Sequence, residues 1–486
     1  MTDIIIIGAG VVGASVARAL SRYDASIMVL ESACDVAEGS SKANSGIVHA
    51  GYDAVPGTLK AKLNVRGAQM YPALAEELGV PYRKNGALIL AFSEEDRATL
   101  EKLLAQGVQN GVEELRIIEK EEIHKLEPQT SDQVVCALLV PTSGIVSPYE
   151  MAFALADHAA VNGVTFRFDT RVTSVRYADG AWQVKTDGGE FTSRILVNCA
   201  GASSAVLHGQ MGGDSAEIIH RRGQYYILDH PDVLPFDHTM FQCPTKMGKG
   251  ILVAPTVHGN VLLGPTAEDI EDPLDVSSSA EGLKSVLDAA RLTWPALSVR
   301  TAITNFSGVR AHEVKGDFLV GKVCEHGYEA AGMESPGLSA APAVGEMLEA
   351  LIANAEGLTP KAAWKPPVRR PRPFNEMSVE ERAQAVTEDP LNGNIICRCE
   401  VVTEAEIRVA IRRPVGATTV DGVKRRTRAG MGRCQGGFCS PRVVEILSEE
   451  LGVPMTDIRK GGKGSELLVG TIREAQQAKA KERQEA

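Results

Sequence analysis

A glycine-rich turn close to the start of the chain constrains the fold more than any other feature of the sequence. The β-branched run Ile4–Ile7 predicts a strand buried on both faces, as in the centre of a parallel sheet. It leads directly into Gly8-Ala9-Gly10-Val11-Val12-Gly13, and a helix is expected over 14–22. A second strand is expected over 27–30, ending at Glu31. This order predicts a dinucleotide-binding βαβ unit.

Each glycine of this turn has a physical task. Gly8 permits the tight turn, Gly10 lets the backbone approach a pyrophosphate, and Gly13 allows the helix to pack closely on the strand. The helix N-terminus supplies N–H groups and a positive dipole end for the phosphates. Glu31 follows Gly13 by eighteen residues and is expected to accept hydrogen bonds from the adenosine ribose hydroxyls. The motif by itself does not separate FAD from NAD.

Composition narrows the class of protein. At roughly 100–200 residues per domain, 486 residues predict two to four domains. Lys and Arg number 51 against 62 Asp and Glu, and the net charge of −11 argues against a general nucleic-acid-binding surface. The sequence pattern predicts no transmembrane helix and no export signal. We therefore expect a cytoplasmic protein with at most peripheral membrane contact.

Four of the nine cysteines gather near the C-terminal end, namely Cys397, Cys399, Cys434 and Cys439. Without an export signal, metal binding is favoured over a disulfide framework. Four thiolates suit either zinc or an iron–sulfur cluster. The first pair is separated by one residue, which departs from the usual C-x₂₋₄-C spacing of structural zinc sites.

Three later segments favour a flavin. Residues 166–175 predict a strand followed by a hairpin at Asp179-Gly180, and residues 195–202 predict an apolar strand ending in small residues. Gly332 and the run Ser335–Ser339 precede an alanine-rich helix expected over 340–352. That helix N-terminus could stabilise negative charge on a reduced flavin ring.

The segment Gly39–Tyr52, read together with the glycine turn, resembles the D-amino-acid-oxidase-like superfamily of FAD enzymes. Within it, the chain is most similar to FAD-dependent glycerol-3-phosphate dehydrogenases and L-2-hydroxyglutarate dehydrogenases. Supporting stretches are 222–226, 264–267, 306–310, 316–321 and 334–342, so that the resemblance covers roughly residues 1–355. It implies an α/β fold in which a Rossmann-type FAD-binding domain is interleaved with an α+β substrate domain.

The resemblance implies the following domain ranges. The flavin body spans 1–362, with FAD-binding parts at about 1–75, 150–210 and 320–362 and substrate-domain parts at about 76–149 and 211–319. The expected FAD contacts are Gly8, Gly10, Val12, Gly13, Glu31, Ser41, Asn44, Ser45, Gly46, Val172, Ala200, Gly201, Gly332, Gly337, Leu338 and Ser339.

The resemblance also implies that a secondary alcohol beside an acidic group is oxidised by hydride transfer to flavin. His49 lies in the loop that such enzymes place at the flavin ring and is the preferred general base, with His312 and His220 as weaker candidates. Arg310 is expected to hold the anionic group of the substrate through its guanidinium fork. Gln224 and Tyr225 are expected to border the same pocket.

Residues 397–400 and 423–439 closely resemble the bacterioferritin-associated-ferredoxin-like [2Fe–2S] domain, with all four ligand positions present. We assign this small C-terminal domain to 392–457, after a Pro-rich linker over 363–391 and before a tail over 458–486. Five basic residues crowd the domain: Lys424, Arg425, Arg426, Arg428 and Arg433. They could stabilise a reduced cluster, form a solvated face or dock an acidic electron-transfer partner. Nucleic-acid binding is disfavoured, because no aromatic residues interleave with these basic residues.

Together the two resemblances predict oxidation of sn-glycerol 3-phosphate to dihydroxyacetone phosphate. Electrons would leave singly through the cluster to an acceptor protein, a partner subunit or a quinone pathway. The alternatives are oxidation of L-2-hydroxyglutarate, of another 2-hydroxy acid, or of a secondary amine such as a proline derivative. A non-catalytic electron-relay subunit is an alternative of another class, and the presence of both His49 and Arg310 argues against it.

Overall fold

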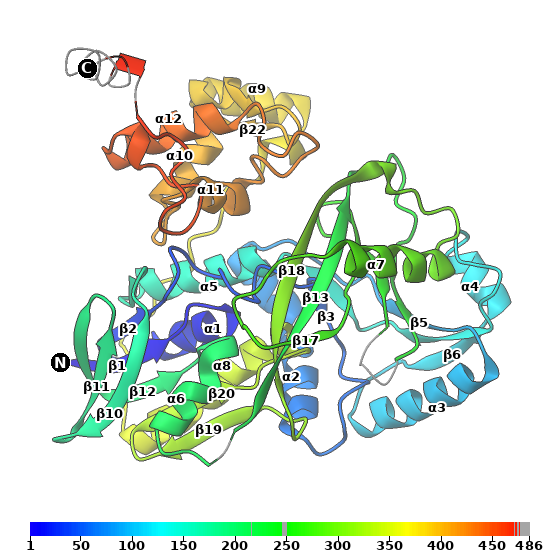
Figure 1. The fold of residues 1–486 in the computed structure, drawn as a ribbon, viewed down its shortest axis with the longest axis horizontal. Helices are drawn as coiled ribbons and strands as arrows, with labels where there is room; N and C mark the ends of the chain where they lie inside the picture. Colours follow the sequence, from blue (N-terminus) through cyan, green and yellow to red (C-terminus); the bar gives the residue numbers. More distant parts are fainter. Residues whose placement is uncertain (215, 245–249, 471, 474–475, 477–486) are drawn as a thin grey trace, which may run out of the picture. The chain divides into compact units, whose positions relative to one another are not determined.

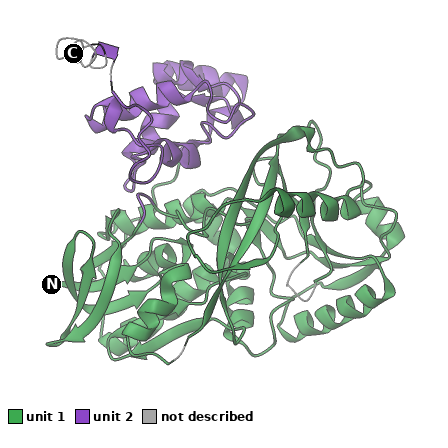
Figure 2. Cartoon of the chain, in the orientation of Figure 1, with its two compact units in different colours: residues 1–32, 36–370 green, residues 33–35, 371–486 purple. Residues whose placement is uncertain are grey.

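The computed structural model describes residues 1–214, 216–244, 250–470, 472–473 and 476 (Figure 1). The chain divides into two compact units, shown in green and purple in Figure 2. Unit 1 comprises Met1–Ser32 and Val36–Arg370, and unit 2 comprises Ala33–Asp35 and Pro371–Ala486. Within the described residues, no helix has both the length and the apolar character needed to cross a bilayer.

The first sheet of unit 1 is built around the N-terminal strand β1. Its residues Ile4, Ile5 and Ile6 are completely buried, and β1 pairs in parallel with β2 on one side and β12 on the other. The strand order is β10-β11-β12-β1-β2-β9, with β20 beside β12 and β19 beside β20. The predicted α/β architecture with a Rossmann-type start is therefore confirmed. The strands are β1(Thr2–Ile7), β2(Ile27–Leu30), β9(Thr165–Arg167), β10(Val172–Ala178), β11(Ala181–Thr186), β12(Gly189–Asn198), β19(Leu319–Cys324) and β20(Gly327–Ala331).

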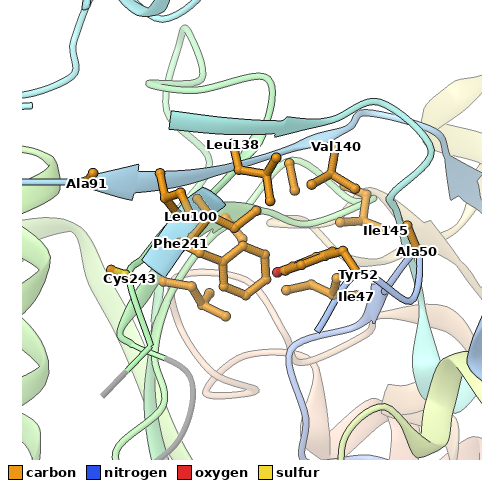
Figure 3. Close-up of a cluster of buried hydrophobic side chains, with 14 of the residues drawn as sticks. Ile47, Ala50, Tyr52, Ala91, Leu100, Leu138, Val140, Ile145, Phe241 and Cys243 are labelled. Carbon is orange, nitrogen blue, oxygen red and sulfur yellow. The ribbon is translucent and has the colours of Figure 1, made fainter. Parts of the chain in front are cut away.

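The second sheet of unit 1 has the order β17-β13-β16-β15-β14-β5-β7-β6, with β18 paired to β13. β13 and β18 run antiparallel from the pair Ile218 and Glu313 to the pair Leu228 and Ala302. One face of this sheet buries a cluster in which Leu138 and Phe241 meet Ile47 and Tyr52 of an earlier loop (Figure 3). This packing joins the loop around residue 49 to the second sheet. The strands are β5(Ala87–Ala91), β6(Arg116–Glu119), β7(Cys136–Val140), β13(Ile218–Leu228), β14(Thr239–Gln242), β15(Leu252–Pro255), β16(Val261–Gly264), β17(Glu268–Ile270) and β18(Ala302–Glu313).

The helices of unit 1 cover these sheets, and α1 packs against both α5 and α8. A small third sheet has the order β3-β8-β4, with β3(Ile47–Val48), β4(Tyr82–Arg83) and β8(Gly144–Val146). The helices are α1(Val11–Leu20), α2(Leu59–Leu78), α3(Glu94–Gln109), α4(Lys120–Leu126), α5(Pro148–Val161), α6(Ser204–Gln210), α7(Ala280–Thr293) and α8(Gly337–Glu356), with the 3₁₀ turns η1(Gly201–Ser203) and η2(Val299–Thr301).

The single strand predicted over 166–175 is two strands in the structure. β9 ends at Arg167 and β10 begins at Val172, and Asp169 between them has a φ of 51°. The break has a physical cause, because the chain bends around Glu31. The Glu31 amide donates to the Arg167 carbonyl (2.9 Å), and the Thr170 amide donates to the Glu31 carbonyl (2.8 Å). The predicted hairpin at Asp179-Gly180 joins β10 to β11.

The Pro-rich segment predicted as a linker does not behave as a spacer over residues 361–370, which we call the strap. The Lys361 ammonium donates to the carbonyls of Ser21 (2.9 Å) and Asn162 (2.6 Å). The Trp364 indole donates to the Ser21 hydroxyl (3.0 Å), and its ring centroid lies 4.3 Å from that of His158. The strap is therefore part of unit 1, held by side chains that supply the hydrogen bonds a proline-rich backbone cannot make for itself.

The remainder of the predicted linker belongs to unit 2. Ser378 and Glu381 form a reciprocal capping box at the start of α9(Val379–Glu388). The Phe374 amide donates to the Glu406 carboxylate (3.0 Å), which ties the segment before α9 to α10(Glu404–Arg412). The predicted boundary at residue 392 is therefore too late, because residues 371–391 pack with the cysteine-bearing domain rather than connecting to it.

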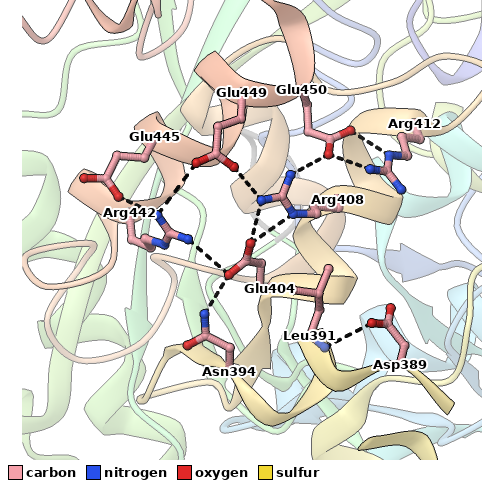
Figure 4. Close-up of polar contacts among 10 residues, drawn as sticks. All are labelled: Asp389, Leu391, Asn394, Glu404, Arg408, Arg412, Arg442, Glu445, Glu449 and Glu450. Atoms are coloured by element: carbon pink, nitrogen blue, oxygen red, sulfur yellow. Dashed lines mark hydrogen bonds and ion pairs between the residues drawn. The ribbon is translucent and has the colours of Figure 1, made fainter.

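Unit 2 is a small helical domain with one two-stranded ribbon. Its apolar core brings Ile407 of α10, Val423 of α11 and Ile446 of α12 together with Cys397 and Cys439. Beside this core, Arg408 bridges Glu404 to Glu449 and Glu450, and so ties α10 to α12 (Figure 4). The elements are α9, α10(Glu404–Arg412), α11(Val420–Thr427), α12(Ser440–Leu451), β21(Ile395–Cys397), β22(Val402–Thr403), η3(Phe374–Glu376), η4(Pro390–Gly393) and η5(Met455–Asp457).

The tail predicted from residue 458 begins later than expected. Ile458 is buried in the core of unit 2, and the Val420 amide donates to the Arg459 carbonyl (3.1 Å). These contacts place the start of the predicted tail in the domain. Beyond residue 470, the predicted tail lies outside the described residues except for 472–473 and 476.

Candidate functional site

The predicted phosphate-binding turn has the close packing that requires glycine. Gly8 has a φ of 102°, and a Cβ there would lie 2.4 Å from the Cys199 carbonyl oxygen. A Cβ on Gly13 would lie 2.0 Å from the Gly8 carbonyl oxygen. The Ala200 Cα would lie 3.4 Å from a Cβ on Gly8, so this turn also brings Ala200 beside Gly8. Cofactor contact by Ala200 and Gly201 stays a prediction. The cradle therefore fits a pyrophosphate approached by backbone alone.

The carboxylate of Glu31 is held next to this turn. One of its oxygens, Oε2, accepts from the Ala9 amide (2.7 Å), and Oε1 accepts from the Ser32 hydroxyl (3.1 Å). The β-strand that carries Glu31 ends beside β1, so the acidic side chain lies at the carboxyl edge of the sheet. This is where a ribose would be bound if pyrophosphate occupied the glycine turn. Val172 opens β10 across the bend described above.

The segment 39–46 runs from the start of α1 toward the second sheet, and we call it the flavin loop. The Val11 amide at the start of α1 donates to the Ser41 hydroxyl (2.9 Å). Asn44 stabilises the loop itself, because its Oδ1 accepts from the Gly46 amide (2.8 Å) and its Nδ2 donates to the Ser41 carbonyl (3.0 Å). Gly46 has a φ of 66°, and Ser45 precedes it. FAD contacts by Ser41, Asn44, Ser45 and Gly46 stay predictions.

β18 lies against the flavin loop, which positions Arg310. A Cβ on Gly308 would be 2.0 Å from the Ala43 carbonyl oxygen, so the two backbones touch there. Arg310 lies two residues further along the same strand and therefore projects from the same face. Gly308 and the loop together bring this arginine beside the region predicted to hold the flavin.

The surroundings of Arg310 fit an anion site. Its Nη2 donates to the Thr266 carbonyl (3.0 Å), whereas its Nε is buried without a hydrogen-bond partner among the described residues. A buried donor of this kind needs an acceptor, and an anionic substrate group would supply one. Gly223 on β13 leaves room for the segment whose carbonyl binds the guanidinium, because a Cβ there would lie 2.8 Å from the Pro265 Cβ and 3.1 Å from the Thr266 carbonyl oxygen.

Tyr225 borders the same face of β13 and β18. It stacks on Phe306 with ring centroids 4.7 Å apart, and its hydroxyl is in a buried environment. Burial raises the pKa of Tyr225, and the positive charge of Arg310 acts in the opposite direction. Tyr225 pairs with Phe306, four residues before Arg310 on β18, and its place in one pocket with Arg310 stays a prediction.

Gln224 points elsewhere. Its Oε1 accepts from the Ser279 amide (2.8 Å), and its Nε2 donates to the Ser279 hydroxyl (3.4 Å), so the side chain holds the start of α7. A Cβ on Gly282 would lie 2.3 Å from Nε2, which shows how closely the helix encloses the amide. The structure gives Gln224 a structural task, and substrate contact by this residue stays a prediction.

His49 is buried, and its backbone is held from two helices. The His49 amide donates to the hydroxyl of Ser339 in α8 (2.7 Å). In the amide orientation that satisfies both of its polar atoms, Asn64 of α2 donates to the His49 carbonyl (2.8 Å). The imidazole lies 5.7 Å from the Phe241 ring, between centroids. These contacts fix the backbone of His49, and its role as the general base stays a prediction.

The start of α8 is anchored by α2 rather than by a side-chain cap. Pro336, the N-cap residue of α8, makes no side-chain hydrogen bond to the helix, and the Tyr71 hydroxyl donates to the Leu338 carbonyl (2.7 Å). A Cβ on Gly67 would lie 2.0 Å from the Ser339 carbonyl oxygen. Asn64, Gly67 and Tyr71 could not be singled out from the sequence, because α2 carries no motif and contacts across long sequence distances leave no local pattern.

The expected cofactor contacts at this helix divide into two groups. The Ser339 hydroxyl faces the His49 segment, since it also donates to the Ile47 carbonyl (3.3 Å), and is occupied there. Gly332 has a φ of 65° and turns the chain toward Gly337, where α8 begins. The backbone N–H groups at this uncapped helix start fit a group that gains negative charge on reduction.

The weaker histidine candidates both have protein partners. His220 Nε2 lies 2.9 Å from the Ala202 carbonyl oxygen. His312 Nδ1 lies 3.0 Å from Glu334 Oε1, which is also 2.7 Å from the Lys60 ammonium. Burial acts to raise the pKa of Glu334, but Lys60 and His312 hold it below its usual value. His312 therefore belongs to an ion-pair cluster.

The four C-terminal cysteines form two pairs of thiols. Cys399 Sγ and Cys434 Sγ are 3.7 Å apart, well beyond the ~2.05 Å of a disulfide bond. The hydrogen bond between Cys397 and Cys439 lowers the pKa of Cys397 to about 6 and raises that of Cys439. Elsewhere in the described chain, no group of three or more His, Cys, Asp or Glu side chains is placed to hold a single metal ion, and these two thiol pairs do not form such a group either.

The loops around these thiols are built for close packing and for N–H···S bonds. A Cβ on Gly432 would lie 2.3 Å from the Cys399 Cβ, and Gly436 has a φ of 86°. The pKa of Cys434 is lowered, mainly by the Phe438 amide, while desolvation acts in the opposite direction. Backbone N–H groups directed at sulfur tune iron–sulfur clusters. The donor set and its cradle therefore fit a [2Fe–2S] group.

Several of the basic residues near the cysteines have structural partners in unit 2. Arg426 is buried and donates to both oxygens of Asp35 (2.6 and 2.7 Å), and Arg428 Nε donates to Glu400 (2.7 Å). Such bidentate or buried pairs order the loops that carry the ligands. Arg433, by contrast, is exposed. The basic cluster is thus not uniformly a solvated face.

Comparison with known families agrees with this geometry. Residues 3–351 match the family model of FAD-dependent oxidoreductases. This chain belongs to that family. Residues 395–449 match the BFD-like [2Fe–2S] binding domain. The FAD-dependent oxidoreductase therefore carries two cofactors, FAD in unit 1 and a [2Fe–2S] cluster in unit 2, as predicted.

Individual relatives of this oxidoreductase extend the comparison. It is 46% identical over 473 residues, 97% of this chain and 98% of the relative, to a glycerol 3-phosphate dehydrogenase of Caloramator mitchellensis. A solved structure of L-α-glycerophosphate oxidase from Mycoplasma pneumoniae with FAD bound is 31% identical, with a TM-score of 0.72, covering 76% of this chain and 99% of that one. An L-2-hydroxyglutarate dehydrogenase of Arabidopsis thaliana is 28% identical over 71% of this chain and 82% of the relative.

Proposed function

We propose that this oxidoreductase converts sn-glycerol 3-phosphate to dihydroxyacetone phosphate. The observation that carries the proposal is the 46% identity to a relative named glycerol 3-phosphate dehydrogenase, which extends over 97% of the chain and therefore over both units. The relative named L-2-hydroxyglutarate dehydrogenase matches at 28% over 71% of the chain. Similarity that includes the iron–sulfur unit favours the first substrate over the second.

The side chains of unit 1 supply what such an oxidation requires from the protein. FAD, when bound, accepts the hydride from the carbon that carries the alcohol. Arg310 would hold the phosphate, because its buried Nε lacks an acceptor and its fork suits a phosphate oxygen pair. His49 would take the alcohol proton, and Ser339 and Asn64 fix its backbone for that task.

Electrons would leave one at a time through the [2Fe–2S] cluster of unit 2. A one-electron transfer centre in the same chain as a flavin favours dehydrogenase activity with a separate electron acceptor over oxidase activity with O₂. The acceptor would be a carrier protein, a partner subunit or a quinone pathway, and we retain a cytoplasmic location as part of the proposal. Equal peroxide yield and turnover in air before and after removal of the cluster would contradict this route.

An anaerobic substrate screen tests the proposed reaction directly. Purified holoprotein is mixed with glycerol 3-phosphate, L-2-hydroxyglutarate or L-proline, and loss of the oxidised flavin absorption is followed. Glycerol 3-phosphate is expected to bleach the flavin at once. Bleaching only by 2-hydroxyglutarate or proline would replace the substrate, and no bleaching by any of them would favour an electron-relay subunit.

A further inference from the structure

One edge of the iron–sulfur site opens to solvent. Cys397 and Cys439 are buried, with 2% and 3% of their surface exposed, and they belong to the apolar core of unit 2. Cys399 is exposed and Cys434 is half-buried, and their sulfurs are the pair 3.7 Å apart. The Cys399–Cys434 edge is therefore the side at which an external molecule can approach the cluster most closely.

An aromatic side chain stands at this edge without a place in the core. Phe438 is 87% exposed, although its neighbour Cys439 is buried. It follows Gly437, whose amide donates to the Cys434 carbonyl (3.0 Å), so that its backbone adjoins the exposed ligand pair. A single exposed apolar side chain is common on protein surfaces, so it is the place of Phe438 beside the exposed ligand pair that makes it available as a contact for a partner.

The charges beside this edge are positive. Arg398 lies between Cys397 and Cys399, and Arg433 directly precedes Cys434; both are exposed. The nearest acidic residue in sequence, Glu400, is buried and accepts from Arg428 (2.7 Å). The main acidic group of unit 2, on α10 and α12, is engaged by Arg408, Arg412 and Arg442 (Figure 4). The edge is thus basic in a chain whose net charge is −11.

We propose that the Cys399–Cys434 edge, with Phe438 as its apolar anchor and Arg398 and Arg433 as its charged rim, is the docking surface for an acidic one-electron carrier protein. The proposal rests on the proposed function, in which electrons leave through the cluster. Oxidation of each substrate molecule releases two electrons and two protons. Each encounter passes one electron to the carrier, so two carrier molecules are reduced per substrate, and no covalent bond forms between the proteins.

The composition of the edge suits this kind of partner. Transient electron-transfer complexes have small interfaces, below about 1,200 Å², so a single aromatic anchor and a few charges can account for most of the contact. Opposite charges steer the encounter and raise its rate, and this effect declines as salt screens it. An acidic carrier would use both features, whereas a basic carrier would be repelled by the arginines.

The experiment compares two forms of one carrier. Holoprotein is reduced with dithionite, freed of excess reductant, and mixed without oxygen with oxidised cytochrome c in its native basic form or in its succinylated acidic form. Haem reduction is followed by stopped-flow absorbance at several salt concentrations. We expect faster reduction of the succinylated form, with an advantage that disappears at high salt.

Variants locate the surface. Phe438→Ala is expected to lower the second-order rate constant for the acidic form about tenfold, and Phe438→Tyr to restore most of it. Arg398→Gln is expected to lower it about threefold at low salt only. The matched controls in unit 2 are Val379→Ala, at a 76% exposed position on α9, and Arg412→Gln on α10, and both are expected to retain the wild-type rate. Cluster content of each variant is checked by visible absorption.

Two results would overturn the docking surface. One is equal or faster reduction of native cytochrome c compared with the succinylated form at low salt. The other is an unchanged rate for cluster-loaded Phe438→Ala and Arg398→Gln. Neither result depends on glycerol 3-phosphate, since dithionite supplies the electrons. Failure of this surface is therefore distinguishable from failure of the proposed substrate, which the anaerobic bleaching experiment tests.

Discussion

The two cofactor sites are assembled from the chain in opposite ways. The residues around the predicted flavin site come from the first strand, the flavin loop, β12, β18 and the start of α8, which span more than 300 positions of the sequence. The four thiols of the iron–sulfur site all lie between Cys397 and Cys439, on two loops of one small domain. The first site depends on the global packing of unit 1, and the second depends on local loop geometry.

This difference decides what a sequence reveals. The ligands of a local site can be recognised from their spacing in the sequence. For a site built from distant segments, only the segment that carries a regular motif can be recognised. It also predicts that damage to either site should remain within its own unit. Substitutions that separate the two cofactors are therefore the sharpest tests of the comparison.

The largest effect is expected from Gly13→Ala. The added Cβ would lie 2.0 Å from the Gly8 carbonyl oxygen, so the turn that carries the phosphates must open. We expect complete loss of bound FAD with retention of the cluster, measured as flavin absorption and iron content per protein. The control is Gly188→Ala, where a Cβ meets nothing within 4 Å. Full flavin occupancy in Gly13→Ala would show that this turn does not form the binding site.

The reciprocal substitution is Cys397→Ser. Removal of one of four ligands should abolish the [2Fe–2S] absorption and EPR signals, because a serine oxygen is a poor substitute for a thiolate that binds iron. Flavin content and its bleaching by substrate should be unaffected. Cys324→Ser, in β19 of unit 1, is the matched control and should keep the cluster. Loss of FAD together with the iron would mean that the two sites are not independent.

Within the distributed site, His49→Ala tests the proposed base. The protein should remain yellow and folded, while anaerobic single-turnover flavin reduction slows by roughly 10²–10⁴-fold, the usual contribution of a general base. His124→Ala on α4, whose imidazole lies 3.5 Å from Asp132, is the control. Normal single-turnover reduction in His49→Ala would remove this histidine from the mechanism.

Arg310→Ala should act mainly on substrate affinity. Loss of a charged hydrogen-bonding fork costs about 1.5–3 kcal/mol, so KM for the true substrate should rise roughly 10–100-fold. The KM of Arg310→Lys should lie between those of the wild type and Arg310→Ala, because lysine keeps the positive charge but lacks the two-pronged guanidinium. Arg116→Ala, a surface residue paired with Glu122, serves as the control. An unchanged KM in Arg310→Ala would refute the anchor role.

The same contrast explains which features could be predicted from the sequence. β2 follows the expected residues 27–30, and the glycine turn and four cysteines are local signals that needed no tertiary information. The contacts of Asn64 and Ser339 with His49 could not be predicted from the sequence, because only folding brings α2 and α8 to that loop. The break between β9 and β10 was missed for a similar reason, since Glu31 causes it from far away in the sequence.

The linker prediction failed through two different causes. The capping box at Ser378 and Glu381 was a local signal for α9, and the proline-rich composition before it obscured the pattern. The strap had no local signal, because its contacts are with residues far away in the sequence. These are Ser21, just after α1, His158 on α5, and Asn162, just after α5. The proline content of the strap therefore could not reveal that residues elsewhere in unit 1 hold it in place.

The smallest expected effect tests the strap. Trp364 donates to Ser21 and lies over His158, with the guanidinium groups of Arg18 and Arg22 at 5.1 and 4.8 Å from its ring. Trp364→Ala should lower the free energy of unfolding of unit 1 by about 1–3 kcal/mol, through lost packing and cation–π contacts. Urea unfolding followed by release of flavin fluorescence measures this change.

Val368→Ala is the control for that measurement, because it removes an apolar side chain from the same segment at a position that is 43% exposed. The visible absorption of the cluster, followed in the same titration, reports on unit 2 and should not shift in either variant. If Trp364→Ala unfolds at the same urea concentration as the wild type, residues 361–370 act as a spacer after all. If flavin and cluster signals shift together, the strap couples the stability of the two units, and the division between a distributed and a local site does not extend to their unfolding.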